Sequence, residues 1–397
     1  SLPYDWHHMA RLALPALAHL PAEAAHSGIR ELANEAIRTP GAIRLNVGQP
    51  NFPTPKHISE AGKRAIDENM TFYTHTQGLI SLREKLVAKL QRVNGITVTP
   101  DRIACGPGGV GAIAAVFGAV LEPGDEVLLP DPGWPNTRLM LTWVHAKGVF
   151  YPCAAADGFQ PDIDAIARLI TPRTKLLLIN SPNNPTGAVY PKATVERLVD
   201  LAQRHNLWLL SDECYDQIIL DGTWTSPASL APDDPRIVSI FTFSKSYSMT
   251  GWRIGYAAGS AELIDTATKV LESNSSCVST ITQVAAEAAL DGPQDCVGEM
   301  VAAYRHRRDV VVDILREADM LISEPTGAFY CMADISRSRL PARDFAFKFL
   351  RERGVSVAPG TAFGEVAAGA VRISLASSDA DLREGVGRLA EFVSQLA

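Results

Sequence analysis

The chain has 397 residues, a formal net charge of −7, and 46% hydrophobic against 20% charged residues. This composition excludes a disordered or fibrous chain, and the acidic balance without a long basic run argues against a nucleic-acid binder that works through phosphate contacts. No stretch is apolar for long enough to span a bilayer, and the length predicts more than one domain.

The cysteines are scattered along the chain, and no two of them form a CxxC pair. This spacing predicts neither a zinc site nor a disulfide framework, so we expect no metal and a reduced, cytoplasmic setting. Isolated cysteines are usually small buried residues. The cysteines are Cys105, Cys153, Cys214, Cys277, Cys296 and Cys331.

The first clear element in chain order is an amphipathic helix over residues 78–93. A second amphipathic helix is predicted over residues 192–206, and short apolar runs lie on both sides of it. Strands that alternate with helices predict βαβ units, and hence an α/β fold with a mostly parallel central sheet flanked by helices. The predicted strands are residues 126–130, 175–180, 207–212 and 237–243.

The pattern changes after about residue 290, where a long helix over residues 297–318 is followed by short strands and helices. We therefore predict a large domain over residues 48–290 and a smaller α/β domain over residues 291–397. Residues 1–47 precede the first βα signals, so we expect this N-terminal segment to pack with the smaller domain.

Polar side chains follow the ends of the predicted strands, at the edge where ligands bind in open parallel sheets. In the turn SPNNPTG, Asn183 or Asn184 either belongs to a plain loop or directs an amide at a ligand. Asp212 ends the next strand, and Tyr215 follows it. Because a buried carboxylate is costly unless it is paired, Asp212 makes a salt bridge, caps a helix or faces a cationic ligand atom.

The last of these strands leads into Ser244 and Lys245, and Arg253 follows in the apolar sequence GWRIGY. Taken singly, each basic residue is explained by a solvated side chain. Together with the asparagine, the aspartate and the tyrosine, they match the needs of pyridoxal phosphate. This cofactor takes a lysine for a Schiff base, a carboxylate against its pyridinium nitrogen, and donors to its phenolic oxygen. Its phosphate takes an arginine and backbone N–H groups.

A glycine-rich turn opens an apolar helix over residues 105–121 (CGPGGVGAIAAVFGAVL). Gly106, Gly108 and Gly111 fit the pattern GxGxxG, which raises a nicotinamide-dependent oxidoreductase, although the pattern alone is weak. The preceding run RIAC is a poor strand, and no clear acidic strand end follows at the expected distance. The turn suits the phosphate of either cofactor, or a plain helix start packed with small residues.

Two further residues have alternative explanations. Trp134, after the strand at residues 126–130, is either a core tryptophan or a stacking partner for a flat cofactor. Arg372 lies in the otherwise apolar run AGAVRISLA. It is either an edge-strand arginine that faces water or a bidentate clamp for a substrate α-carboxylate, in which case the substrate is an amino acid.

Several ordered motifs between about residue 28 and the C-terminus give the chain a family resemblance. The chain resembles the class I/II aminotransferases, the fold-type-I pyridoxal-phosphate enzymes of the aspartate aminotransferase superfamily, and especially their bacterial aspartate and prephenate branch. The motifs are NVGQPNFPTP (46–55), YTHTQGLISLRE (73–84), PGDEVLLPDPGW (123–134), NSPNNPTGAVYP (180–191), SDECYD (211–216), SKSYSMTGWRIGYAAG (244–259), PTGAFY (325–330) and VRISLA (371–376).

The resemblance implies roles for the residues around the cofactor ring. Lys245 forms the Schiff base and then acts as general base, and Asp212 pairs with the pyridinium nitrogen. Asn184 and Tyr215 hold the phenolic oxygen, and Trp134 stacks on the ring. Lys245, Asp212 and Tyr215 are therefore the expected catalytic residues, while Trp134 and Asn184 are also expected to contact the substrate.

The resemblance also implies the residues that hold the two anionic groups. Arg372 and Gly48 are expected to meet the substrate carboxylate. Tyr73 is expected to reach the cofactor phosphate of a neighbouring subunit, which predicts a homodimer with shared active sites. The residues expected to hold the phosphate within one subunit are Gly108, Gly109, Val110, Thr242 and Arg253.

Val110 departs from the pattern of some aspartate-using relatives, which carry a lysine there to bind the distal carboxylate. The valine offers no charge, so we expect that an amino acid with a distal carboxylate is not the preferred donor.

The function favoured by the sequence is a pyridoxal-phosphate-dependent aminotransferase that moves an amino group from an L-amino acid to a 2-oxo acid in ping-pong half-reactions. The nearest alternative keeps the cofactor but makes the chain a lyase or cyclase that eliminates a leaving group. The nicotinamide-dependent oxidoreductase is the remote alternative. The sequence leaves the donor, the acceptor and the pathway open.

Overall fold

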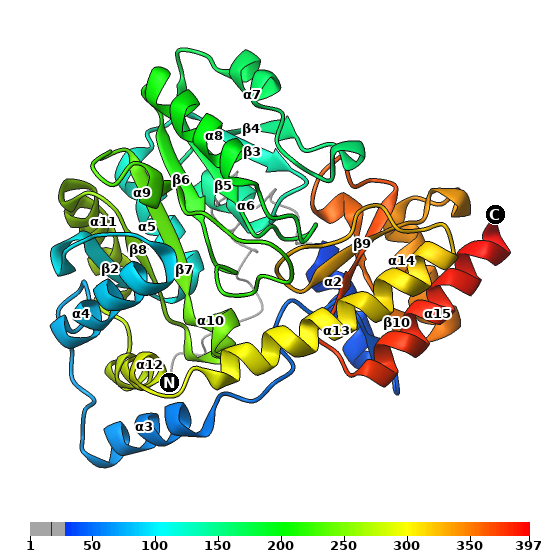
Figure 1. The fold of residues 1–397 in the computed structure, drawn as a ribbon, viewed down its shortest axis with the longest axis horizontal. Helices are drawn as coiled ribbons and strands as arrows, with labels where there is room; N and C mark the ends of the chain where they lie inside the picture. Colours follow the sequence, from blue (N-terminus) through cyan, green and yellow to red (C-terminus); the bar gives the residue numbers. More distant parts are fainter. Residues whose placement is uncertain (1–16, 18–27) are drawn as a thin grey trace, which may run out of the picture.

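The computed structural model describes residue 17 and residues 28–397, and its largest element is a seven-stranded sheet. Neighbouring strands are parallel except at β8, which is antiparallel to both of its neighbours. The predicted α/β fold with a mostly parallel sheet is therefore confirmed (Figure 1). Across the sheet the strands are β2 (Ile103–Gly106), β8 (Gly255–Ala258), β7 (Ile237–Thr242), β6 (Trp208–Asp212), β5 (Thr174–Asn180), β3 (Glu126–Asp131) and β4 (Lys147–Pro152).

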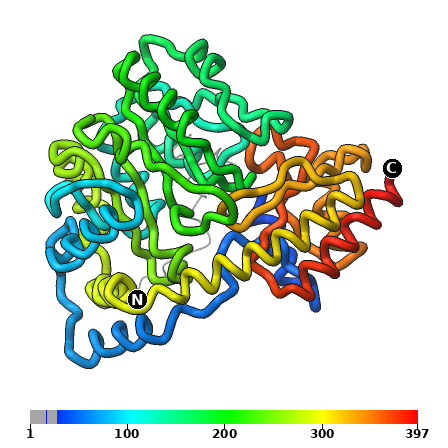
Figure 2. Tube along the Cα trace, viewed as in Figure 1, coloured from blue at the N-terminus to red at the C-terminus, as the bar shows by residue number. Residues whose placement is uncertain are grey.

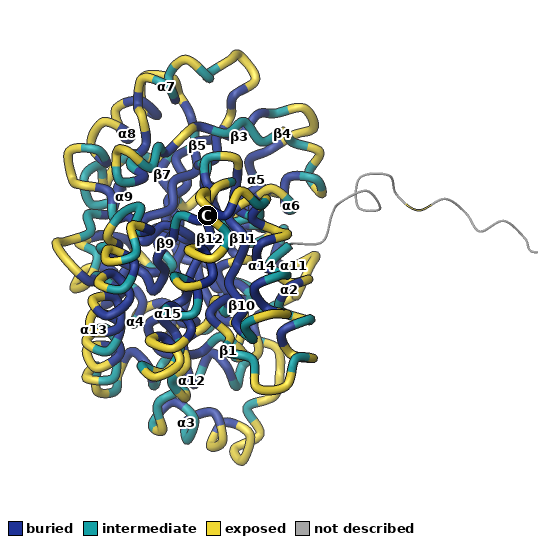
Figure 3. The backbone as a smooth tube through the Cα atoms, turned by 90° about the vertical axis from the view of Figure 1, so that its right-hand side faces the viewer, coloured by how far each residue is buried: buried dark blue, intermediate teal, exposed yellow. Residues whose placement is uncertain are grey.

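The central strands are buried on both faces, as helices on both sides of a parallel sheet require. Val127 and Leu129 of β3 pack with α5 (Gly108–Val120), α6 (Asn136–Trp143) and α11 (Ala261–Ser275), whereas the alternate residue Leu128 packs with α7 (Ile163–Leu169) and α8 (Lys192–Arg204). Figure 3 shows the central strands mostly in the colour of buried residues. The alternation of side chains along a strand thus gives each face its own core.

The predicted amphipathic helices lie where the hydrophobic period places them. The first is α4 (Ile80–Lys89), which continues through a π-helical turn over Leu90–Asn94, and its leucines at positions 82, 86 and 90 are buried. The second is α8. The remaining helices of this part are α3 (Lys56–Asp67), α9 (Pro227–Leu230), α10 (Phe243–Ser246) and α12 (Thr280–Asp291).

The interpretation of RIAC as a poor strand is wrong, because Ile103–Gly106 forms β2 and pairs with β8 along its whole length. The run has few residues of high β-propensity. Its strand conformation depends on pairing with β8 and on burial, which override local preference.

A second, smaller group of elements follows the long helix α13 (Asp295–Glu317), which runs from α12 to this group (Figure 2). The described part of the N-terminal segment, from residue 28, lies against it, since β1 pairs with β10 and α2 contacts α14. Residues 1–27, apart from residue 17, lie outside the described part of the chain. The elements are α2 (Gly28–Arg38), β1 (Ile43–Arg44), β9 (Tyr330–Asp334), α14 (Ala342–Arg353), β10 (Val355–Ser356), β11 (Ala358–Pro359), β12 (Ala370–Ser374) and α15 (Asp379–Leu396).

Among the described residues, no helix is both long and apolar enough to cross a lipid bilayer.

Candidate active site

A cavity of about 720 Å³ opens at the carboxyl ends of β5, β6 and β7, between the large sheet and the smaller group of elements. The cavity brings together most of the residues predicted from the sequence. Gly108 adjoins the lining through Gly109, and Tyr73 lies outside it with 87% of its surface exposed. The predicted residues that line the cavity are Gly48, Gly109, Val110, Trp134, Asn184, Asp212, Tyr215, Thr242, Lys245, Arg253 and Arg372.

Lys245 lies in the short helix α10, directly after β7. Thr242 begins this helix, because its hydroxyl oxygen accepts a hydrogen bond from the Ser244 amide at 3.2 Å. The Lys245 Nζ donates to the Gly48 carbonyl at 2.8 Å. Burial lowers the pKa of Lys245 to about 8, and the positive charges of Arg372 and Arg253 act in the same direction. A larger share of the amine is therefore unprotonated near neutral pH than in an ordinary lysine, which favours its use as a nucleophile.

Asp212 ends β6 and is aligned with the last residue of the neighbouring strand β5. That residue, Asn180, donates through its side chain to the Asp212 carbonyl at 3.1 Å. The Cys214 amide donates to the carboxylate at 3.2 Å. Burial raises the pKa of Asp212 against the effect of that hydrogen bond and of the Lys245 charge. A desolvated carboxylate of this kind gains most from a cationic partner placed in the cavity.

The N-terminus of α5 faces Arg253. The first-turn amides have no partner within the helix, and Pro107, which precedes the helix, gives them no side-chain cap. Gly108 adopts φ = +76°, and a Cβ there would lie 2.4 Å from Nη2 of Arg253. Arg253 Nη1 donates to the Thr250 carbonyl at 2.7 Å, which holds the guanidinium beside the helix start. Free amides, the helix dipole and a guanidinium together form an anion site.

Arg372 lies on β12, the central strand of a three-stranded sheet, and only 2% of its surface is exposed. The alternative of an edge-strand arginine that faces water is therefore wrong. Nη1 donates to Asn184 Oδ1 and Nη2 to the Asn46 carbonyl, each at 2.8 Å, and the guanidinium lies over the Tyr330 ring at 4.3 Å. A guanidinium held in this way is suited to binding a carboxylate.

Tyr330 is a cavity residue that the sequence reasoning missed. Its hydroxyl lies 2.9 Å from the Tyr215 hydroxyl, and both side chains are buried. The motif PTGAFY contained this tyrosine, but nothing local in the sequence pairs it with a residue 115 positions earlier. Ile29, Ala33 and Ile37 of α2 also line the cavity. Their spacing of four residues is typical of one face of a helix, and this spacing could have indicated that the helix lies against the site.

The sequence from residue 40 to residue 389 matches the family described as Aminotransferase class I and II. The chain belongs to this family. The aspartate/prephenate aminotransferase of Thermus thermophilus is 38% identical over 356 residues, which cover 89% of this chain and 91% of that protein. The aromatic-amino-acid aminotransferase 2 of Thermococcus litoralis is 34% identical and covers 93% of this chain and 96% of its own.

Solved structures of the family agree with the sequence comparison. The aspartate aminotransferase of Thermus thermophilus with maleate has a TM-score of 0.90 and is 37% identical, over 95% of this chain and all of that chain. The predicted resemblance to class I/II aminotransferases and the fold-type-I architecture are confirmed, and the chain is an aminotransferase. Members of this family use pyridoxal phosphate.

Proposed function

We propose that the cavity binds pyridoxal phosphate and that the chain uses it to move the amino group of an L-amino acid to a 2-oxo acid. The observation that carries this proposal is the placement of a lysine amine, a buried carboxylate and an arginine-flanked helix N-terminus around one cavity. These three groups suit the aldehyde, the ring nitrogen and the phosphate of the cofactor. A dinucleotide would give no task to the lysine or the carboxylate.

The phosphate would be held by the first-turn amides of α5, at Gly108, Gly109 and Val110, by Arg253 and by the hydroxyl of Thr242. A side chain on Gly108 would collide with the guanidinium, so glycine keeps this cradle open.

The ring would be held from its two polar edges. Asp212 would pair with the ring nitrogen, and Tyr215 and Asn184 would donate to the phenolic oxygen. Asn184 is oriented for this role, because its Oδ1 accepts from Arg372 and its amide Nδ2 remains free to donate toward the cavity. We assign Trp134, which lines the same cavity, to the face of the ring.

The bound cofactor supplies an aldehyde that condenses with amines and a ring that accepts electrons when a bond beside the nitrogen breaks. The chain's own residues supply binding and proton movement. Arg372 would bind the substrate carboxylate, with the Gly48 backbone beside it. Lys245 Nζ would take up the proton that leaves the substrate α-carbon, a task that its lowered pKa suits.

The test is to load the protein with pyridoxal phosphate, supply a panel of amino acids with and without a 2-oxo acid, and measure 2-oxo acid and ammonia. We expect the 2-oxo acid that corresponds to the donor, without ammonia. Released ammonia would replace the proposal by the lyase or cyclase alternative. Binding of a nicotinamide dinucleotide in place of pyridoxal phosphate would replace it by the oxidoreductase.

Replacing Val110 by lysine is expected to raise kcat/KM for aspartate relative to a neutral amino acid by about tenfold, since a cation would then face the distal carboxylate. Val110 lines the cavity in the first turn of α5 and is 37% exposed. Val93 is 38% exposed and is not a lining residue, so Val93→Lys is the matched control. Equal turnover of aspartate and neutral amino acids by the unaltered protein would contradict the selectivity that we infer.

We also infer that the chain forms a homodimer in which Tyr73 reaches the phosphate of the neighbouring subunit. Ile66, Phe72, Tyr73 and Ile80 gather exposed apolar surface on and between α3 and α4, where Phe72 is 79% exposed. Such surface is typical of an interface. We expect a dimer in sedimentation of the full chain, and a monomer at working concentration would contradict it.

The division into a large domain over residues 48–290 and a small domain over residues 291–397, and the cytoplasmic setting, remain predictions of the sequence.

A further inference from the structure

Three segments that lie close to cavity residues in the chain are hydrogen-bonded to one another. We call their meeting point the junction, and it consists of residues 187–189, 218–221 and 325–328. The third segment lies between the other two and is hydrogen-bonded to both. The backbone bonds are Thr326 N and Gly327 N to Gly187 O (2.9 Å each), Leu220 N and Asp221 N to Thr326 O (2.8 and 3.0 Å) and Ala328 N to Ile218 O (2.9 Å).

The junction is packed without spare room. A Cβ on Gly187 would lie 2.4 Å from Pro325 Cβ, and a Cβ on Gly327 would lie 2.6 Å from Val189 Cγ2. Ala328 is fully buried and adopts φ = +55°, a conformation that alanine takes only where its surroundings impose it. The three segments are therefore packed tightly against one another.

Each junction segment lies within three residues of a cavity residue in the chain. Asn184 precedes the first segment, Tyr215 precedes the second, and Tyr330 follows the third. The hydroxyls of Tyr215 and Tyr330 meet at 2.9 Å. Tyr215 and Tyr330 each lie within three residues of the junction, so short stretches of backbone link the junction to this hydroxyl pair.

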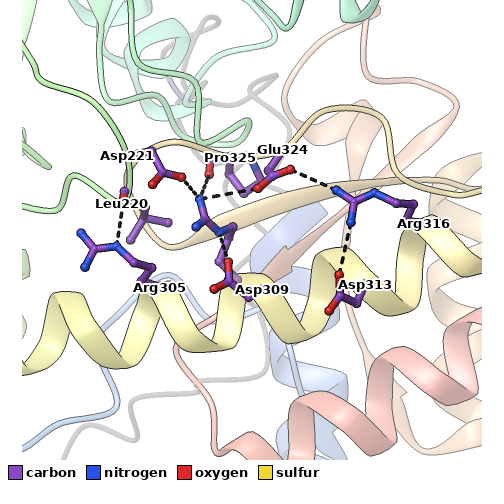
Figure 4. Close-up of polar contacts among 9 residues, drawn as sticks. Leu220, Asp221, Arg305, Asp309, Asp313, Arg316, Glu324 and Pro325 are labelled. Carbon is purple, nitrogen blue, oxygen red and sulfur yellow. Dashed lines mark hydrogen bonds and ion pairs between the residues drawn. The ribbon is translucent and has the colours of Figure 1, made fainter.

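Arg308 of α13 is bonded to two segments of the junction. Arg308 Nη1 donates to the Asp221 carboxylate and, at 3.1 Å, to the Pro325 carbonyl, while Nε donates to Asp309 at 2.6 Å (Figure 4). Asp221 and Pro325 belong to two different junction segments. The Arg308 side chain is only 5% exposed, so its charge is desolvated. The hydrogen bonds of Nε and Nη1 fix the orientation of the guanidinium group. The neighbouring Arg305 adds a hydrogen bond from Nε to the Leu220 carbonyl at 2.7 Å.

Arg316 lies two turns later on the same helix and forms solvent-exposed ion pairs. It contacts Asp313 at 3.2 Å and Glu324 at 3.1 Å, and its side chain is 56% exposed. Its hydrogen bonds reach neither Asp221 nor Pro325. Both arginines pair with Glu324, which lies 3.9 Å from Arg308, but only Arg308 is buried and bonded to Asp221 and Pro325, so Arg316 is a control for the shared ion pair.

We propose that Arg308 is a positioning residue, which fixes Asp221 and Pro325 to α13 and thereby sets the Tyr215–Tyr330 hydroxyl pair at the depth where Tyr215 donates to the cofactor's phenolic oxygen. This inference rests on the proposed function, because it needs the cofactor in the cavity. Arg308 itself touches none of the reacting atoms.

The consequence is measurable without turnover. A hydrogen bond donated to the phenolic oxygen favours the state in which that oxygen carries full negative charge and the site has released its proton. Weakening this hydrogen bond therefore raises the pH midpoint at which the visible absorbance of the cofactor-loaded protein changes. A change that only loosened the fold would lower the melting temperature and leave this midpoint in place.

The experiment is a pH titration of absorbance for the cofactor-loaded protein, four single variants and one double variant. Tyr215→Phe is expected to raise the midpoint by about one pH unit, since it removes the hydrogen bond outright. Arg308→Lys, which keeps the charge but loses the fork, and Asp221→Asn are each expected to raise it by about half a unit. Arg316→Lys is expected to leave it unchanged.

The double variant Arg308→Lys with Asp221→Asn is expected to shift the midpoint no further than Arg308→Lys alone, because Asp221 acts on the junction through its contact with Arg308. Unchanged midpoints in Arg308→Lys and Asp221→Asn, beside a shifted Tyr215→Phe, would overturn the role of Arg308 alone. An unchanged midpoint in Tyr215→Phe would instead overturn the proposed contact between Tyr215 and the cofactor. Asp221 is half exposed, so its variant tests the inference even if Arg308→Lys folds poorly.

Discussion

Replacing Lys245 by alanine is expected to lower kcat for amino-group transfer by about ten-thousandfold or more. The variant loses the amine that we propose attaches to the cofactor and takes the α-proton, and positioned proton transfer alone contributes up to about ten-thousandfold. The measurement is the initial rate of 2-oxo acid formation with the best donor. A second measurement is the mass of the intact protein after borohydride reduction in the presence of the cofactor. Only the unaltered protein should gain the mass of the cofactor.

The fold is expected to survive this change, because alanine removes an amine whose burial already disfavours its charged form. Lys192 lies at the start of α8, pairs with Glu196 and has a side chain that is 64% exposed, so Lys192→Ala is the control for loss of a lysine. Retained activity in Lys245→Ala, or covalent cofactor on it after reduction, would remove this lysine from the mechanism.

The part of the site built by the large sheet could be predicted from the sequence because one rule orders it. Parallel strands end at the same edge, so the asparagine turn, Asp212 and Lys245 had to lie near one another once their strands were recognised. The strand register agrees, since Asn180 of β5 is opposite Asp212, and Asp212 is opposite Ile240 of β7.

The position of the cavity wall formed by the second sheet and α2 could not be predicted from the order of the parallel strands. Arg372 and Tyr330 lie on neighbouring strands of the second sheet, and α2 adds a further face to the cavity. The placement of this wall depends on tertiary contacts such as those of Arg308, which no local pattern encodes. A similar reason explains the missed strand at RIAC, whose partner β8 lies about 150 residues away in the chain.

Asp212 is the second residue where a large effect is expected. Asp212→Asn keeps the size and shape of the side chain but removes the charge that would hold the ring nitrogen protonated. We expect kcat to fall by about a thousandfold, as when a preorganised electrostatic partner is removed from an enclosed site. Initial rates at saturating cofactor measure this, and cofactor affinity measured separately by equilibrium titration shows how much of the loss is binding.

The neighbouring carboxylate supplies the control, because Glu213 is also fully buried but bonds away from the cavity, to Trp224 at 2.9 Å and Ser226 at 2.7 Å. Burial raises the pKa of Glu213 to about 7, so its neutral form is already accessible and an amide imitates it, with the Ser226 hydroxyl free to turn and accept. Glu213→Gln is therefore expected to keep kcat within a few-fold of the unaltered protein. If the two variants lost activity equally, the effect at Asp212 would reflect buried charge in general rather than a carboxylate facing the cofactor.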